Sequence, residues 1–126
     1  MLVALGNLAA CQKAGTIHTA HALTHFLNYC ATNHHVMLRY NASSMILQTH
    51  SDASYLTAPR ARSCVGGFFF LGNNFTTQKP NQSGINAPVH CEAEILRNVL
   101  SSSAEAEIGA LFCNAKLAIP LRVTLM

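Results

Sequence analysis

The chain has 126 residues, of which 50% are hydrophobic and 10% are charged, and its net charge is +3. This length and balance exclude a disordered chain and predict one globular domain with a single hydrophobic core. The small positive charge permits an anionic partner but does not by itself argue for one.

Five cysteines, an odd number, stand far apart without any Cys-x-x-Cys pair. This spacing favours reduced thiols in an intracellular protein, cytoplasmic or nuclear, over a disulfide framework. The apolar N-terminus lacks the basic leader and the cleavage site of a signal peptide, and no apolar run approaches the ~20 residues of a membrane span. We therefore expect no association with a membrane.

The first 32 residues predict two helices. Residues 1–13 are rich in leucine and alanine and precede Gly15, and a second helix is expected over 17–32 with Thr16 as its N-cap. On the second helix, the helical spacing predicts one apolar face made of Ala20, Leu23, Phe26, Leu27 and Cys30.

The opposite face of the second helix carries three histidines, His18, His21 and His25. Two of them are four residues apart, but the residue after His21 is Ala22, not the general-base glutamate of a His-Glu-x-x-His zinc motif. No cysteine or carboxylate lies nearby on that face. The pattern therefore favours a solvated polar face over a metal site.

A short strand is expected over residues 37–40, and a turn over residues 41–44. Residues 45–55 are expected to form a half-buried strand, because apolar and polar side chains alternate along its first half. This strand carries Asp52, the only aspartate of the chain, followed by small residues. A carboxylate in such a place can reach solvent beside the sheet and hold a hard cation.

Residues 63–71 predict a second strand. Gly66 and Gly67 inside it indicate a bulge or the close approach of another backbone. The link at 58–61 is short, so these two strands should form an antiparallel hairpin.

After a polar loop at 72–86, the alternation of residues 87–97 predicts a third strand of the same sheet. One face of this strand would be apolar, and the other would carry His90, Glu92 and Glu94. For the two glutamates we favour a solvent face over a catalytic role. A cysteine hydrolase is disfavoured, because His90 and Cys91 point to opposite faces of the strand and Cys91 points to the apolar one.

The last helix is expected to begin near Ser102, which has the spacing of a capping box with Glu105. Pro120 should interrupt or restart this helix. Because Glu105 has a structural role in this arrangement, Glu107 is the better candidate for chemistry. Glu107 lies at the edge of a face that the i, i+3, i+4, i+7 spacing predicts to be buried, formed by Ile108, Leu111, Phe112 and Ala115.

Three sequence blocks, at 50–53, 62–72 and 102–107, resemble the ribonuclease H domain of copia-type LTR retrotransposon polyproteins. The first block, His-Ser-Asp-Ala, is similar to the one that holds the first catalytic aspartate of that family. The second, Arg-Ser-Cys-Val-Gly-Gly-Phe-Phe-Phe-Leu-Gly, is similar to its second strand. The third, Ser-Ser-Ala-Glu-Ala-Glu, is similar to the start of its first helix and is the most specific of the three.

Residues 1–44 are similar to the helical segment that connects the reverse transcriptase to the ribonuclease H domain in the same polyproteins. The resemblance thus implies an α+β chain with two N-terminal helices in this connection segment. Residues 45–126 would form a C-terminally truncated ribonuclease H-like domain, with an antiparallel three-stranded sheet and a helix after the third strand.

The resemblance also implies a reaction and its ligands. Enzymes of this family hydrolyse the RNA strand of RNA–DNA hybrids by in-line attack of water, with two Mg²⁺ ions held by several carboxylates. By resemblance Asp52 would bridge the two ions and Glu107 would bind one of them, so the two side chains should approach each other at the edge of the sheet. Arg60 and Arg62 would contact the nucleic acid.

The chain departs from the family pattern after its last helix, where the later catalytic aspartates of the family would follow. Asp52 is the only aspartate present, and two carboxylates leave two Mg²⁺ ions under-ligated. We therefore expect a fragment of a reverse transcriptase polyprotein that is inactive alone. Glu92 or Glu94 could complete the site only if the third strand turned them toward Asp52.

Two non-catalytic functions remain open beside this one. A remnant of the domain could bind nucleic acid without cleaving it, through Arg39, Arg60, Arg62 and Lys79. Alternatively, a small structural domain could associate with itself and bury its missing sheet edge against another copy.

Overall fold

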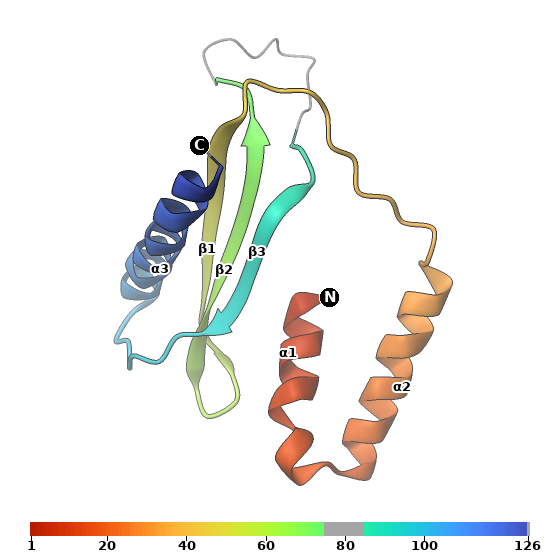
Figure 1. Ribbon diagram of the computed structural model, residues 1–126. Helices are drawn as coiled ribbons and strands as arrows, with labels where there is room; N and C mark the ends of the chain where they lie inside the picture. The colour runs from red at the N-terminus through yellow and green to blue at the C-terminus, as the bar shows by residue number, and fades with distance from the viewer. Residues whose placement is uncertain (75–84, 126) are drawn as a thin grey trace. The chain divides into compact units, whose positions relative to one another are not determined.

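The computed structural model describes residues 1–74 and 85–125, which belong to two compact units, Met1–Leu38 and Arg39–Met126 (Figure 1). The sequence predicts the boundary between the connection segment and the main domain after residue 44, whereas the two units divide after Leu38. The described residues form three α-helices and an open antiparallel sheet of three strands, so the expected α+β class is confirmed.

The first unit is a pair of helices, α1 (Leu2–Ala10) and α2 (Ile17–Thr32), joined by the 3₁₀ turn η1 (Gln12–Ala14). α2 begins as predicted. The Thr16 hydroxyl accepts a hydrogen bond from Thr19 N at 3.3 Å, and the Thr19 hydroxyl accepts one from Thr16 N at 3.2 Å. This reciprocal cap pairs two N–H groups that would otherwise lack a partner. Neither helix contains a fully buried residue.

The second unit contains the sheet. β1 (Ile46–Ala58), β2 (Arg62–Gly72) and β3 (Pro88–Ile95) run antiparallel in the order β1-β2-β3, which confirms the three predicted strands and their hairpin. The β1–β2 turn is tight because Arg60 and Ala61 both take the left-handed conformation, with φ angles of 65° and 52°.

The short strand predicted at 37–40 is wrong, and no strand forms there. One backbone hydrogen bond connects this segment to the start of the third strand, from Ala87 N to Arg39 O at 2.9 Å. The next residue is Pro88, which has no N–H to extend the ladder. The segment that follows is held instead by the buried side chain of Asn86, which donates to Asn41 O at 3.0 Å.

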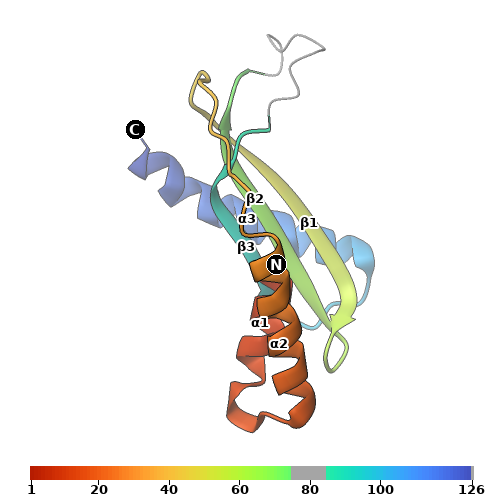
Figure 2. The same ribbon diagram turned by 90° about the vertical axis from the view of Figure 1, so that its right-hand side faces the viewer.

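The helix α3 (Ser103–Thr124) packs on one face of the sheet, chiefly over β1 and β2 (Figure 1 and Figure 2). Its N-cap is Ser102, whose hydroxyl accepts a hydrogen bond from Glu105 N at 3.1 Å. The Glu105 carboxylate accepts two further hydrogen bonds, from the N–H and the hydroxyl of Ser101, both at 2.7 Å. Glu105 therefore has the capping role that was expected, although its partner is Ser101 and not the N-cap N–H.

The buried face predicted for this last helix is wrong. Ile108, Leu111 and Phe112 are 68%, 61% and 64% exposed. Two faces of α3 carry side chains at helical spacing that could pack on the sheet. The sequence pattern predicts burial of the face with the larger apolar side chains. The face that packs on the sheet is the small and polar one, formed by Ala106, Ala110 and Asn114.

α3 also continues through Pro120, where the sequence predicted an interruption. A proline removes one hydrogen bond to the preceding turn and crowds its carbonyl. The last turn is held by other bonds, because the Thr124 hydroxyl donates to Pro120 O at 2.9 Å and Leu125 N donates to Leu121 O at 3.1 Å.

A small core lies between α3 and the sheet, centred on Val65, Leu96 and Ala110. Beside it the buried side chain of Asn114 connects the helix to two strands. Its amide nitrogen donates to Ser51 Oγ of β1 at 2.7 Å and to the carbonyl oxygen of a β2 residue, Gly66, at 2.9 Å. This contact fixes how α3 is rotated on the sheet.

Gly67 lies directly under the Asn114 side chain. A Cβ atom added at Gly67 would overlap Asn114 Oδ1 and would come within 2.9 Å of the Phe69 ring. The glycine pair predicted the close approach of another part of the chain, and this approach occurs at Gly67. It explains why α3 presents small side chains to the sheet.

We expect Gly67→Ala to lower the free energy of unfolding by about 1–3 kcal/mol, the range for an overpacked core, because the new methyl group must displace Asn114 or Phe69. Urea unfolding followed by circular dichroism measures this change. Gly66→Ala is the matched control, since a Cβ there meets only Asp52 O at 3.8 Å. Equal stabilities of the two variants would contradict the close packing.

Candidate functional site

Asp52 lies near the middle of β1, is exposed, and pairs with Gly66 of β2. The preceding residue, Ser51, points toward α3, because its hydroxyl accepts a hydrogen bond from Asn114. Successive side chains of a strand point to opposite faces of the sheet. The Asp52 carboxylate therefore projects into solvent, as expected, but from the sheet face that α3 does not cover.

Glu107 lies on the first turns of α3, next to the buried Ala106, and is exposed. Among the described residues, no ion pair or hydrogen bond joins it to Asp52. The register does not place the two carboxylates on one face of the sheet. A shared Mg²⁺ ion stays a prediction of the resemblance, and this arrangement does not support it, because each ligand oxygen must lie about 2.0–2.1 Å from the ion.

The two glutamates of β3 lie on the same face of the sheet as α3. The helix covers this face over β1 and β2, beside β3. Val65, which packs in the core under α3, pairs with Glu94, and Glu92 shares this face two residues earlier. Asp52 points to the opposite face. Neither glutamate can therefore complete a carboxylate site around Asp52.

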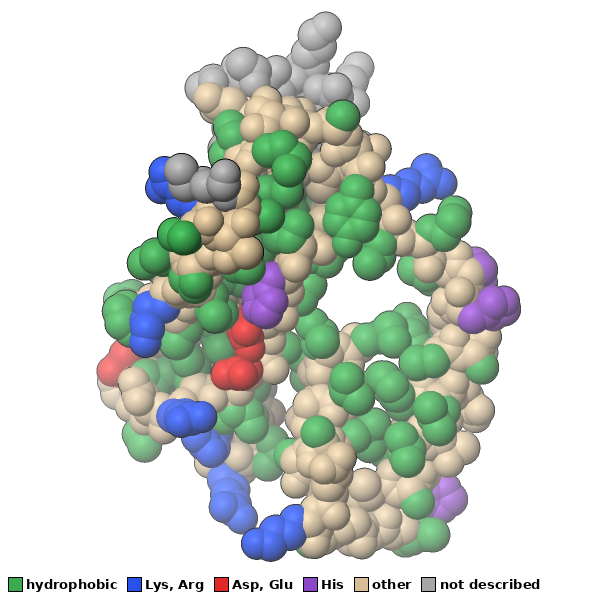
Figure 3. Space-filling model, viewed as in Figure 1, with side chains coloured by type: hydrophobic (Ala, Val, Ile, Leu, Met, Phe, Trp, Pro, Cys, Tyr) green, Lys and Arg blue, Asp and Glu red, His purple; other side chains and the backbone are tan. Residues whose placement is uncertain are grey.

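His90 and Glu92 form a pair on this face, with His90 Nε2 3.3 Å from Glu92 Oε2. The His90 ring also lies against Phe69, with 5.4 Å between the ring centroids. Figure 3 shows histidine and acidic side chains gathered over β3. The sequence interpretation assigned both residues to a polar face but missed their contact, which the i, i+2 spacing on a strand could have indicated.

Within residues 1–74 and 85–125, no three His, Cys, Asp or Glu side chains gather into a group that could hold a metal ion. All five cysteines belong to this part of the chain and are free thiols.

The arginines proposed to contact nucleic acid differ in their surroundings. Arg60 is exposed at the tip of the β1–β2 hairpin. The Arg62 guanidinium donates to Leu96 O at 3.3 Å, so this side chain links the start of β2 to the end of β3. Arg39 is exposed, and Lys79 lies outside the described residues.

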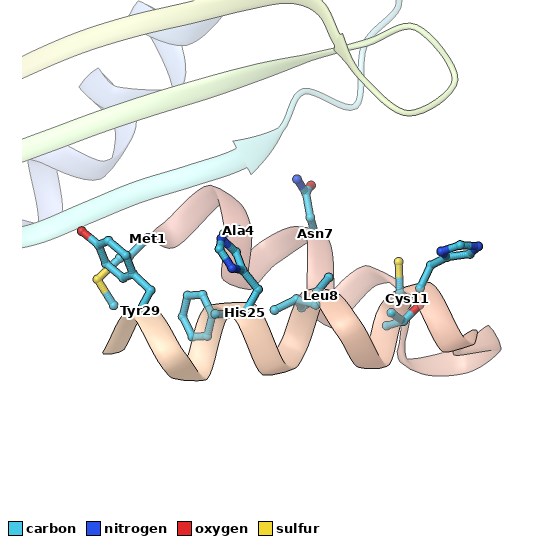
Figure 4. A pocket seen from close by; sticks show the side chains of 11 residues that line it. Met1, Ala4, Asn7, Leu8, Cys11, His25 and Tyr29 are labelled. Atoms are coloured by element: carbon cyan, nitrogen blue, oxygen red, sulfur yellow. The ribbon is translucent and has the colours of Figure 1, made fainter. Parts of the chain in front are cut away.

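In the first unit, a groove of about 610 Å³ lies between α1 and α2 (Figure 4). Its lining includes Met1, Leu8, Phe26, Tyr29 and two of the three α2 histidines, His18 and His25.

The face predicted to be the apolar one on α2 meets α1 only in part, because Phe26 lines the groove. Leu23 and Leu27 of that predicted face are 47% and 56% exposed, and the side turned to α1 carries Thr19 and Ala22. The three histidines are nevertheless exposed, as the sequence predicted.

No family model, no curated protein and no solved structure matches the chain. None of the helices in the described residues is both long enough and apolar enough to cross a membrane.

The two hydrogen bonds that Ser101 donates, first from its N–H and then from its hydroxyl, hold the pKa of Glu105 below its ordinary value. A carboxylate whose folded pKa is lowered stabilises the fold above its unfolded pKa and loses this effect as the pH falls through the folded pKa. We expect Glu105→Gln to unfold at lower urea concentration than the parent at pH 7. This difference should shrink as the pH falls below the ordinary glutamate range.

Glu107→Gln is the control for this experiment, because no described residue donates a hydrogen bond to the Glu107 carboxylate. At a protein concentration low enough to keep the chain monomeric, its urea midpoint should follow that of the parent at every pH. A Glu105→Gln difference that stays constant from neutral to strongly acidic pH would show that the carboxylate charge has no part in the cap.

Proposed function

We propose that the chain is a fragment of a retroelement reverse transcriptase polyprotein, a ribonuclease H-like domain that does not catalyse alone. The order of its elements carries this proposal: an antiparallel hairpin, a third strand beside β2, and then a helix. The three blocks that resemble the copia-type domain fall in the middle of β1, along β2 and at the start of α3. This order and pairing of elements support the proposal.

The number and direction of the acidic side chains support the loss of catalysis. In-line hydrolysis with two metal ions needs several carboxylates around one point. Asp52 points away from α3, which bears Glu107, and Glu105 is engaged in the helix cap. Glu92 and Glu94 lie on the other face from Asp52. These five are all the acidic side chains of the chain.

We expect the purified chain to leave an RNA–DNA hybrid intact in millimolar Mg²⁺, because two ions need several carboxylates around one point, whereas Asp52 and the β3 glutamates lie on opposite faces of the sheet. A time course with a labelled RNA strand, resolved on a denaturing gel, measures cleavage. Asp52→Asn, prepared in the same way, reveals any contaminating nuclease. Mg²⁺-dependent cleavage that is present in the parent and absent in Asp52→Asn would contradict the proposal.

A second function, binding of nucleic acid without cleavage, is favoured by the position of Arg60. An exposed cation at a hairpin tip, on a chain of net charge +3, can contact phosphate groups. We expect weak binding of an RNA–DNA hybrid at low salt. Fluorescence anisotropy should show an affinity that falls as the salt concentration rises.

In this binding experiment, Arg60→Ala should weaken binding and reduce the salt slope by about one. Lys13→Ala, in the first unit, is the charge-matched control and should leave the affinity unchanged. Equal affinity for the parent and Arg60→Ala would exclude the hairpin tip from the contact.

A further inference from the structure

The side of α3 that faces away from the sheet carries a continuous apolar stripe. We call it the outward stripe, and its residues follow one another at i, i+3, i+4, i+7 and i+11. The four large side chains are 61–68% exposed, and the small one is exposed as well. An exposed apolar stripe on a helix is a candidate interaction surface. The outward stripe consists of Ile108, Leu111, Phe112, Ala115 and Ile119.

Charged side chains border the outward stripe in a regular order. On one flank, Glu105 stands near the start of the helix and Lys116 three turns later. On the other flank, Glu107 stands near the start and Arg122 four turns later. All four side chains are exposed, and Lys116 Nζ lies 5.6 Å from the centre of the Phe112 ring. Each flank thus has an acid near its N-terminal end and a base near its C-terminal end.

We propose that the outward stripe pairs with the same stripe of a second copy of this chain, with the two α3 helices antiparallel. A two-fold axis through the middle of the stripe brings Glu107 of each copy within about one helical turn of Arg122 on the same flank of the partner, whereas Glu105 stays engaged in the helix cap. Parallel helices would place like charges opposite each other. Antiparallel helices also align their dipoles favourably.

The dimensions of α3 suit such an interface. A helix of 22 residues is about 33 Å long and about 10 Å wide. A pair in contact over this length covers about 300 Å² on each copy, less than the ~800 Å² per partner of a standard interface, which is the size of a weak, reversible contact. The pairing leaves the face with Ala106, Ala110 and Asn114 on the sheet, so it needs no change of fold. It stands whether or not the chain descends from a ribonuclease H.

Sedimentation velocity of the full chain over a wide range of concentrations tests this pairing. We expect a monomer–dimer equilibrium, and Phe112→Asp should raise its dissociation constant at least about tenfold, because the charge enters the centre of the stripe. Val99→Asp is the matched control, since Val99 is 99% exposed and precedes α3. It should dimerise like the parent. Circular dichroism checks that both variants are folded.

Charge reversal tests the antiparallel direction. Glu107→Lys alone and Arg122→Glu alone should each weaken the dimer by up to about fivefold, as exposed ion pairs do. The two changes together in one chain should restore it, because each new lysine again meets a glutamate of the partner. A parent chain that stays monomeric, or a dimer that Phe112→Asp leaves intact, would overturn the proposal. A double variant weaker than both single ones would overturn the antiparallel direction.

Discussion

The placement of α3 on the sheet depends on one buried amide. Asn114 donates to Ser51 Oγ and to Gly66 O, and so a single side chain connects the helix to two strands. Leaving a buried donor without a partner is costly, which makes these two bonds hard to give up. Among the described residues, Asn114 Oδ1 has no hydrogen-bond donor and lies over Gly67. This contact is possible only because that glycine has no side chain.

The rotation that Asn114 imposes decides which faces of the second unit are buried. The small side chains Ala106 and Ala110 follow Asn114 onto the sheet, and the large apolar ones are left outside. Because the same hydrogen bond turns Ser51 toward α3, the side chain of the next residue, Asp52, points to the opposite face of the sheet. One contact thus accounts for the modest core, for the exposed stripe of α3 and for the position of the acidic side chain on the far face of the sheet.

Local sequence signals predicted the elements well, because each signal acts within a few residues. The hydroxyl of Thr16 reaches the first turn of α2, and alternation with a short link predicts the β1–β2 hairpin. The rotation of the helices was not predicted in either unit. α2 and α3 each have two possible packing faces, and the choice depends on contacts with residues distant in the sequence.

The geometry of the candidate site, like the rotation of the helices, could be predicted only in part from local sequence signals. The alternating pattern predicted an exposed carboxylate near the end of a strand. Asp52 is exposed, but it lies in the middle of β1, which continues to Ala58. Whether that carboxylate lies on the sheet face that α3 covers, near Glu107, depends on which way the side chain at position 52 points. That direction comes from the bond between Ser51 and Asn114, 63 residues apart, which no local pattern contains.

The free edge of β1 has a consequence for the solubility of the protein. No described strand pairs with this outer edge, although β1 keeps a regular register with β2 along 46–54. The unpaired N–H and C=O groups of such an edge can template strands from other molecules, which is how edge-to-edge aggregation begins. Beyond Ser54 an irregular register and a left-handed Leu56 interrupt the strand. Aggregation would therefore start from the first two-thirds of β1, where a single added lysine or proline would protect the edge.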